Sequence, residues 1–347
     1  MGAPMGGNAL KNTQTQRLNR ADFERVAEAV TKELLLAFPE TPVDVIPAYR
    51  TKPSFGDLDV LIQTEGLQAN GGGEKLRQLA VEVFHATDLF KNGNVLSFDY
   101  RASATQMEPG FQVDAIGMPA AEYDFALRYF SFNDLGNLIG RTAHKAGFSF
   151  GHAGLTYPFR EGTYMFRELV LTRDFDEALR FLGYEPERHR EGFESLHDIF
   201  LYVVGSRYFS ADIFLLENRS YKARVRDRKR KTYTEFLDYI GARRLPSYAY
   251  PEDKAVWLPL AFKAFPEFEK AYRQTLHDLA NQRLLKKQFN GERMGAISGL
   301  EGVKLGWLMK HLRESFDSFD AMLGFFQSAT EDEVRKRVLD TQRRLEL

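Results

Sequence analysis

Residues 47–62 read PAYRTKPSFGDLDVLI and place two aspartates directly after a glycine, just ahead of an apolar run. Side chains two residues apart on a strand point to the same face, so Asp57 and Asp59 are expected to project together. Carboxylates are depleted from strands and costly to bury unpaired. The pair therefore either faces solvent at a strand end or holds something positive. Gly56 has no side chain, which lets a ligand come close to the backbone.

A third acidic residue, Asp114, interrupts the strand-like sequence FQVDAIGM. Neighbouring carboxylates repel one another unless a cation lies between them. Mg²⁺ prefers oxygen ligands, and two such ions can stabilise the attacking and leaving oxygens of an in-line displacement. If the two strands are neighbours, we expect Asp57, Asp59 and Asp114 to bind two divalent ions, Mg²⁺ or Mn²⁺. The alternative is that Asp57 ends a turn, Asp59 faces water and Asp114 caps a neighbouring group.

The pattern along the chain predicts an α+β fold, with a small mixed sheet followed by a mainly helical C-terminal part. Strands are expected around both aspartate motifs and at NVLSFDYRA, and TEGLQANGGGE is expected to be a loop. Prolines divide the second half into short helices. The predicted division is a flexible tail at 1–16, a catalytic domain at 17–160, a mixed or helical domain at 161–250 and a helical region at 251–347.

The composition, 44% hydrophobic and 27% charged with a net charge of −1, is that of an ordinary globular protein. The chain has no cysteine, which excludes disulfides and thiolate catalysis. No apolar run approaches the ~18 residues of a membrane helix, and the N-terminal stretch lacks the apolar core of a signal peptide. We expect a protein that is not secreted, has no membrane partner and is cytoplasmic, or is located in the nucleoid or nucleus.

Several segments in order resemble the palm of the family X DNA polymerases, the DNA polymerase beta type. They are KPSFGDLDVLI, VDAI, EYDFALRYFSFNDLGNLIGRTAHKAGFSFGHAGL and FDEALRFLGYEPE, within residues 43–188. The resemblance implies a nucleotidyltransferase fold that moves a nucleoside monophosphate from an NTP or dNTP to a hydroxyl. Asp57 and Asp59 would bind both ions, and Asp114 would bind the catalytic ion beside the acceptor.

The same resemblance implies a nucleotide site. Arg50 falls where the family has a triphosphate-binding arginine, with Lys52 close by. Tyr129 and Phe130 match the segment that packs against the incoming sugar and base, and Asn133 follows in the same turn. The alternative for Arg50 is an exposed, solvated arginine. The alternative for the rings of Tyr129 and Phe130 is the plain core of a helix.

Residues 219–231, RSYKARVRDRKRK, hold eight Lys or Arg against one Asp. Lys and Arg side chains that neutralise the phosphates of a nucleic acid release its counterions, which favours binding. Such a run is therefore typical of a surface that binds DNA or RNA. The alternative is a solvated helix face. The predicted nucleic-acid-binding residues are Lys222, Arg224, Arg226, Arg228, Lys229, Arg230 and Lys231.

Two positions depart from the family pattern. The Gly-Ser that precedes the arginine is replaced by Ile46-Pro47 or Pro47-Ala48, and proline has no N–H to donate. The turn YFTGS reads YFSFN and loses its glycine. The resemblance as a whole leads us to expect nucleotidyl transfer to a nucleic-acid 3′-hydroxyl, with or without a template. The alternatives are a catalytically silent protein of this fold that binds nucleic acid in an assembly, or a transferase that nucleotidylates a protein or small molecule.

Overall fold

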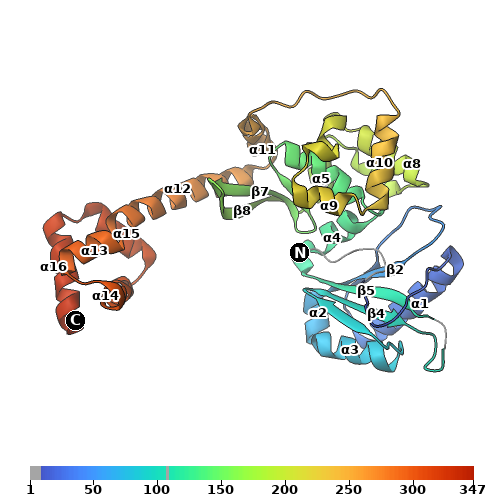
Figure 1. Ribbon diagram of the computed structural model, residues 1–347, viewed down its shortest axis with the longest axis horizontal. Helices are drawn as coiled ribbons and strands as arrows, with labels where there is room; N and C mark the ends of the chain where they lie inside the picture. The colour runs from blue at the N-terminus through green and yellow to red at the C-terminus, as the bar shows by residue number, and fades with distance from the viewer. Residues whose placement is uncertain (1–8, 107–108) are drawn as a thin grey trace. The chain divides into compact units, whose positions relative to one another are not determined.

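The computed structural model describes residues 9–106 and 109–347, and its contacts divide the chain into two units, Met1–Phe268 and Glu269–Leu347. The first unit is α+β and the second is helical, so the predicted α+β class and the helical C-terminal part are confirmed (Figure 1). Within the described residues, no helix combines the length and apolarity that crossing a bilayer requires.

A mixed five-stranded sheet organises the first part of the chain, in the order β1-β2-β5-β4-β3. The central strands β2 and β5 are parallel, and every other neighbouring pair is antiparallel. Their bounds are β1 (Val43–Val45), β2 (Asp57–Gln63), β3 (Leu89–Asn92), β4 (Val95–Tyr100) and β5 (Phe111–Met118).

Alternation along β2 gives the sheet two different faces. Leu58, Val60 and Ile62 point into a core shared with α1 (Arg20–Ala37) and α3 (Gly72–Glu82). Leu61 points the other way and packs with Tyr123 of α4 (Tyr123–Phe130). Asp57 and Asp59 alternate with the core residues and so lie on the α4 face.

The rest of the first unit adds an antiparallel three-stranded sheet and short helices (Figure 1). The strands are β6 (Ser149–Gly151), β7 (Gly154–Glu161) and β8 (Tyr164–Thr172). The helices are α2 (Thr64–Ala69), η1 (Ala120–Glu122), α5 (Leu135–Lys145), α6 (Phe175–Phe181), α7 (Pro186–Glu191), α8 (Leu196–Val204), η2 (Ala211–Ile213), η3 (Leu216–Asn218), α9 (Tyr221–Asp227), α10 (Lys231–Gly241), η4 (Lys254–Trp257) and α11 (Leu258–Ala264).

The second unit has a core of its own, in which Met294, Leu308 and Leu312 are almost completely buried. Its helices are α13 (Gly291–Ser298), α14 (Gly302–Glu314), α15 (Phe319–Ser328) and α16 (Glu331–Arg344), and α12 (Pro266–Gln288) contains the boundary between the units. Thr330 caps α16 in a reciprocal capping box with Glu333, which fixes where this last helix starts.

The predicted domain boundaries differ from the division that the contacts give. The hairpin β7–β8 turns at Gly162, so a division after residue 160 would separate two hydrogen-bonded strands. A division after 250 would cut η4 and α11 from the unit they pack in, where Phe265 contacts Phe181. Local composition does not reveal such pairings, because the partners are distant or joined by an ordinary turn.

Two local predictions also need correction. The first eight residues of the predicted flexible tail lie outside the described residues, but residues 9–16 are packed. Ala9 is buried, and the backbone N–H groups of Lys11 and Asn12 donate to the Asp88 carboxylate. The predicted loop after β2 instead forms α2, whose Leu67 is buried in the core.

Candidate metal centre

Three carboxyl groups meet on the α4 face of the central sheet. The parallel register of β2 and β5 pairs Asp59 with Asp114 and Asp57 with Gln112. One carboxylate oxygen from each of Asp57, Asp59 and Asp114 lies within 4.8 Å of the others. The structure thus brings together the three acids that the sequence singled out, because two of them share a strand and the third lies directly beside them.

The surroundings make the carboxyl groups of Asp59 and Asp114 costly to ionise. Burial raises the pKa of Asp59 well above its ordinary value, and the charges of Asp57 and Asp114 raise it further. Burial also raises the pKa of Asp114 to about 6, with a partly opposing hydrogen bond from Ser97. Asp59 Oδ1 is shielded from solvent and has no hydrogen-bond partner among the described residues. A divalent cation would satisfy this oxygen and remove the mutual repulsion.

The residues that hold Asp114 were not predicted from the sequence. The Gln112 side chain, fully buried, donates from Nε2 to both Asp114 oxygens at 3.0 Å. Its Oε1 in turn accepts the backbone N–H of Ala9 at 3.0 Å. The i,i+2 spacing was a usable signal for Gln112, since both side chains share one face of β5. Ser97 on β4 and Ala9 carried no such signal, because only the fold brings them there.

Lys52 lies against the acidic cluster. Burial lowers its pKa, while the charges of Asp57 and Asp59 act in the opposite direction. Its ammonium also lies 4.8 Å from the centre of the Phe55 ring, a cation–π contact. Of the two predicted nucleotide-binding cations, Arg50 and Lys52, it is therefore Lys52 whose charge interacts with the carboxylates of Asp57 and Asp59.

Arg50 is held elsewhere. Its Nη2 donates to the Glu191 carbonyl at 2.5 Å, and its Nη1 lies 3.6 Å from the Glu194 carboxylate. The backbone N–H of Arg50 donates to the Phe193 carbonyl, which ties this segment to the loop after α7. The arginine is thus fixed on the 191–194 loop. Gly56, just before β2, is buried.

The other predicted nucleotide residues lie around the turn between α4 and α5. Tyr129 is half-buried against Phe150, and Phe130 stacks on His152 with ring centres 6.0 Å apart. Asn133 has φ of 63° and follows Phe132, which is also left-handed, so the YFSFN turn adopts this backbone without glycine. The Phe132 N–H donates to the Pro47 carbonyl at 2.7 Å, which joins the turn to the segment that leads to β2.

The basic run is partly neutralised within the chain. Arg219 and Asp227 form a buried ion pair at 2.8 Å, and Arg226 also contacts Asp227. Arg230 reaches Asp134 in the α4–α5 turn at 2.7 Å. Lys231 pairs with Glu235, and Arg224 is half-buried. The predicted residues that are exposed are Lys222, Arg226, Arg228, Lys229 and Lys231.

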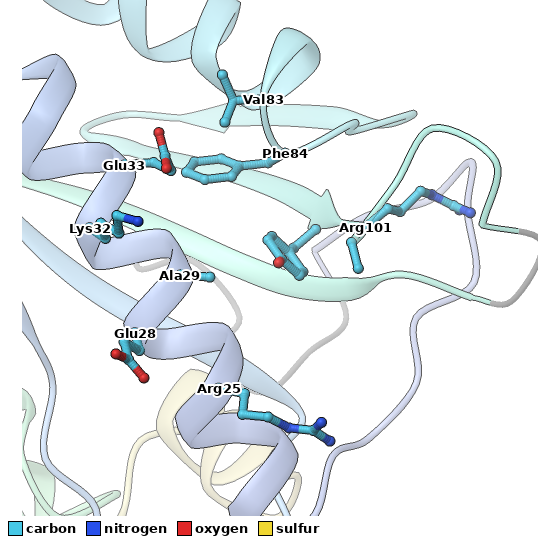
Figure 2. Close-up of a pocket in the computed structure, with 10 residues that line it drawn as sticks. Arg25, Glu28, Ala29, Lys32, Glu33, Val83, Phe84 and Arg101 are labelled. Atoms are coloured by element: carbon cyan, nitrogen blue, oxygen red, sulfur yellow. The ribbon is translucent and has the colours of Figure 1, made fainter.

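A cavity of about 410 Å³ lies away from this centre. Figure 2 shows it between α1 and the end of β4, where Phe84 and Arg101 line it together with Glu28. Phe84 belongs to the core on the α1 face, so this cavity lies on the side of the sheet opposite the three aspartates.

The chain matches no model of a protein family, and no curated protein shows significant sequence similarity to it.

Proposed function

We propose that this protein is a metal-dependent nucleotidyltransferase with a fold of the DNA polymerase beta type. The observation that supports it is the convergence of Asp57, Asp59 and Asp114, with one shielded Asp59 oxygen lacking a partner among the described residues. Two Mg²⁺ or Mn²⁺ ions held by these residues would neutralise the cluster and polarise the phosphate oxygens of an NTP or dNTP.

In the proposed reaction, the 3′-oxygen of a nucleic acid forms a bond to the α-phosphorus. The bond from this phosphorus to its bridging oxygen breaks, and pyrophosphate leaves. The hydroxyl proton needs an acceptor, and the carboxylate of Asp114, which would hold the catalytic ion beside this hydroxyl, is proposed to take it. The Lys52 ammonium, beside the cluster, would attract the triphosphate.

The acceptor is proposed to be a DNA or RNA 3′ end. The exposed members of the basic run, among them Lys222, Arg228 and Lys229, supply the phosphate-binding charge. Arg230 links the end of this run to the α4–α5 turn, next to the residues proposed to contact the nucleotide. Arg50 would first have to release the Glu191 carbonyl before it could bind a triphosphate.

The test is transfer of labelled nucleotide, from each NTP and dNTP, to DNA, RNA and protein acceptors with Mg²⁺ or Mn²⁺. We expect extension by the wild-type protein and a loss of at least 10³-fold for Asp59→Asn, since an amide cannot supply the same ligand charge. Asp124→Asn, an exposed carboxylate on α4, is the matched control and should keep full activity. No transfer by the wild type, or equal transfer by Asp59→Asn, would refute the proposal.

A second candidate is a silent protein of this fold that binds nucleic acid. Pro47 offers no N–H to a phosphate, the Phe132 N–H is already used by Pro47, and Arg50 is held by the 191–194 loop. Calorimetry with a non-hydrolysable triphosphate separates the two, because a silent protein should bind nucleic acid but show no Mg²⁺-dependent triphosphate binding. Transfer to a protein acceptor alone would instead indicate the protein-modifying alternative.

A further inference from the structure

A second cavity, of about 390 Å³, lies on the α1–α3 face of the central sheet, between α2 and α3 and the turn from β3 to β4. Its floor is apolar and almost completely buried. The floor residues are Ile62, Leu67, Leu76, Leu96 and Ala115.

This cavity is separate from the candidate metal centre. Ile62 and Ala115 belong to the core on the α1 face, whereas Asp59 and Asp114 occupy the alternate positions of the same two strands. A ligand in the cavity would therefore lie across the sheet from the carboxylates. A volume of this size equals that of about thirteen water molecules, at ~30 Å³ each, and falls within the usual range for small-molecule sites.

The wall carries two cations that the protein leaves unpaired. Arg77 on α3 and Lys91 on β3 line the cavity and are exposed. Neither makes an ion pair or a side-chain hydrogen bond within the parts of the chain that the structure describes. Of the three cations that line the cavity of Figure 2, two are paired, Arg25 with Asp22 and Arg101 with Asp99, and the third is Lys32.

Glu74 also lines the cavity, so its charged wall carries two positive groups and one negative group. One anionic group on a ligand would be attracted by Arg77 and Lys91, but a second would meet Glu74. We propose that this cavity binds a small amphipathic anion, a compact apolar body that carries a single carboxylate or phosphate group. Its apolar part would cover the floor, and its anionic group would pair with the two cations.

Gly73 gives a way to block the cavity without damaging the fold. It lines the cavity within α3, and a Cβ at this position would meet no atom within 4 Å. A leucine there is expected to fill space that a ligand would use, and it is a better helix former than glycine.

The experiment is calorimetric titration of the full-length protein with octanoate, octyl phosphate, octanol and octylammonium. We expect both anions to bind with one-to-one stoichiometry, and the alcohol and the cation to bind at least tenfold more weakly. Arg77→Gln with Lys91→Gln should weaken octanoate binding at least tenfold, and Gly73→Leu should abolish it. Lys32→Gln, which removes a cation from the cavity of Figure 2, is the matched control and should bind normally.

No anion binding, equal binding of octanol, or unchanged binding by the double variant would overturn the proposal. Undiminished binding by Gly73→Leu would place the ligand elsewhere and would overturn it as well. Asp59→Asn should bind octanoate normally, so this result does not depend on whether the protein transfers nucleotides. A preference between octanoate and octyl phosphate would identify the anionic group that the site favours.

Discussion

Asp114 shows how one residue can link folding to the chemistry of the candidate centre. Seven of the eight residues of β5, Asp114 among them, are buried. Burial raises the pKa of this carboxyl to about 6, so the folded chain retains a proton that the unfolded chain releases near its ordinary pKa of 3.8. Between these values the native state binds more protons, and stability falls as pH rises.

This difference predicts a pH effect on the metal-free protein. Between about pH 4 and pH 6, the free energy of unfolding of the wild type should fall by about 2 kcal/mol relative to Asp114→Asn. Chemical denaturation of both proteins in EDTA measures this difference. Adding Mn²⁺ at pH 7.5 should stabilise the wild type and leave Asp114→Asn unchanged. Parallel curves for the two proteins across this range would contradict the prediction.

Gln112 is the second prediction at this scale. Its Nε2 donates to both oxygens of Asp114, so it favours the ionised carboxylate and fixes its orientation. Gln112→Ala should therefore weaken Mn²⁺ binding by roughly 10- to 100-fold, as loss of a supporting partner commonly does. Calorimetry measures the affinity, and Gln78→Ala, at an exposed position on α3, is the control. Unchanged affinity would mean that Gln112 only fills space.

At the scale of the secondary-structure elements, α7 carries a buried histidine, His189. The His189 ring contacts Phe132, Phe175 and Phe193, and its Nε2 has no partner among the described residues. Burial and, to a lesser extent, the charge of Arg128 lower its pKa to about 3, against the opposing effect of Asp176. The unfolded chain therefore binds more protons between about pH 3 and 6.5, so stability is lost as pH falls through this range.

Replacing this ring should remove the acid sensitivity. At pH 5 we expect His189→Phe to be more stable than the wild type by about 2 kcal/mol, with a smaller difference at pH 7.5. Thermal unfolding at the two pH values measures the change. His197→Phe, which replaces a histidine on α8 that packs against Tyr239, is the matched control. An equal loss of stability on acidification in wild type and His189→Phe would rule out this explanation.

The basic run around α9 contains an arginine in a buried ion pair and other cations that are exposed. Arg219 is buried against Asp227, whereas Lys222, Arg228 and Lys229 are exposed. Changing these three exposed residues to Gln should weaken binding of DNA and RNA similarly for all sequences. It should also reduce the slope of log affinity against log salt by up to about 3. Fluorescence titration at several salt concentrations measures both effects, and a matched triple change at Lys286, Lys287 and Lys336 is the control. An unchanged slope would exclude α9 from the interface.

At the scale of the whole molecule, the chain consists of two units with separate cores. The second unit buries Met294, Leu308 and Val338 around its own centre. A fragment of residues 269–347 should therefore be helical and unfold cooperatively, and a fragment of residues 1–268 should retain any Mn²⁺ binding of the full chain. Circular dichroism and calorimetry of both fragments test this. A fragment 269–347 that lacks a cooperative transition would show that its core is insufficient alone.

The sequence by itself determined features that depend on near neighbours. Strand alternation places Asp57 and Asp59 on one face, and apolar periodicity with proline spacing gives the α+β class and the helical second half. It also singled out Asp114, because a carboxylate in an apolar strand needs a partner. The start of α16 also depends on near neighbours alone, since its capping box spans four adjacent residues.

Only the tertiary structure decided what depends on distant partners. It set the register that places Asp114 beside Asp59, and the support of Gln112 by Ala9, more than a hundred residues away. It also held Arg50 on the 191–194 loop and used part of the basic run to neutralise Asp227 and Asp134. Such pairings follow from how the packed core closes long loops, and no local pattern of residues encodes which distant groups will meet.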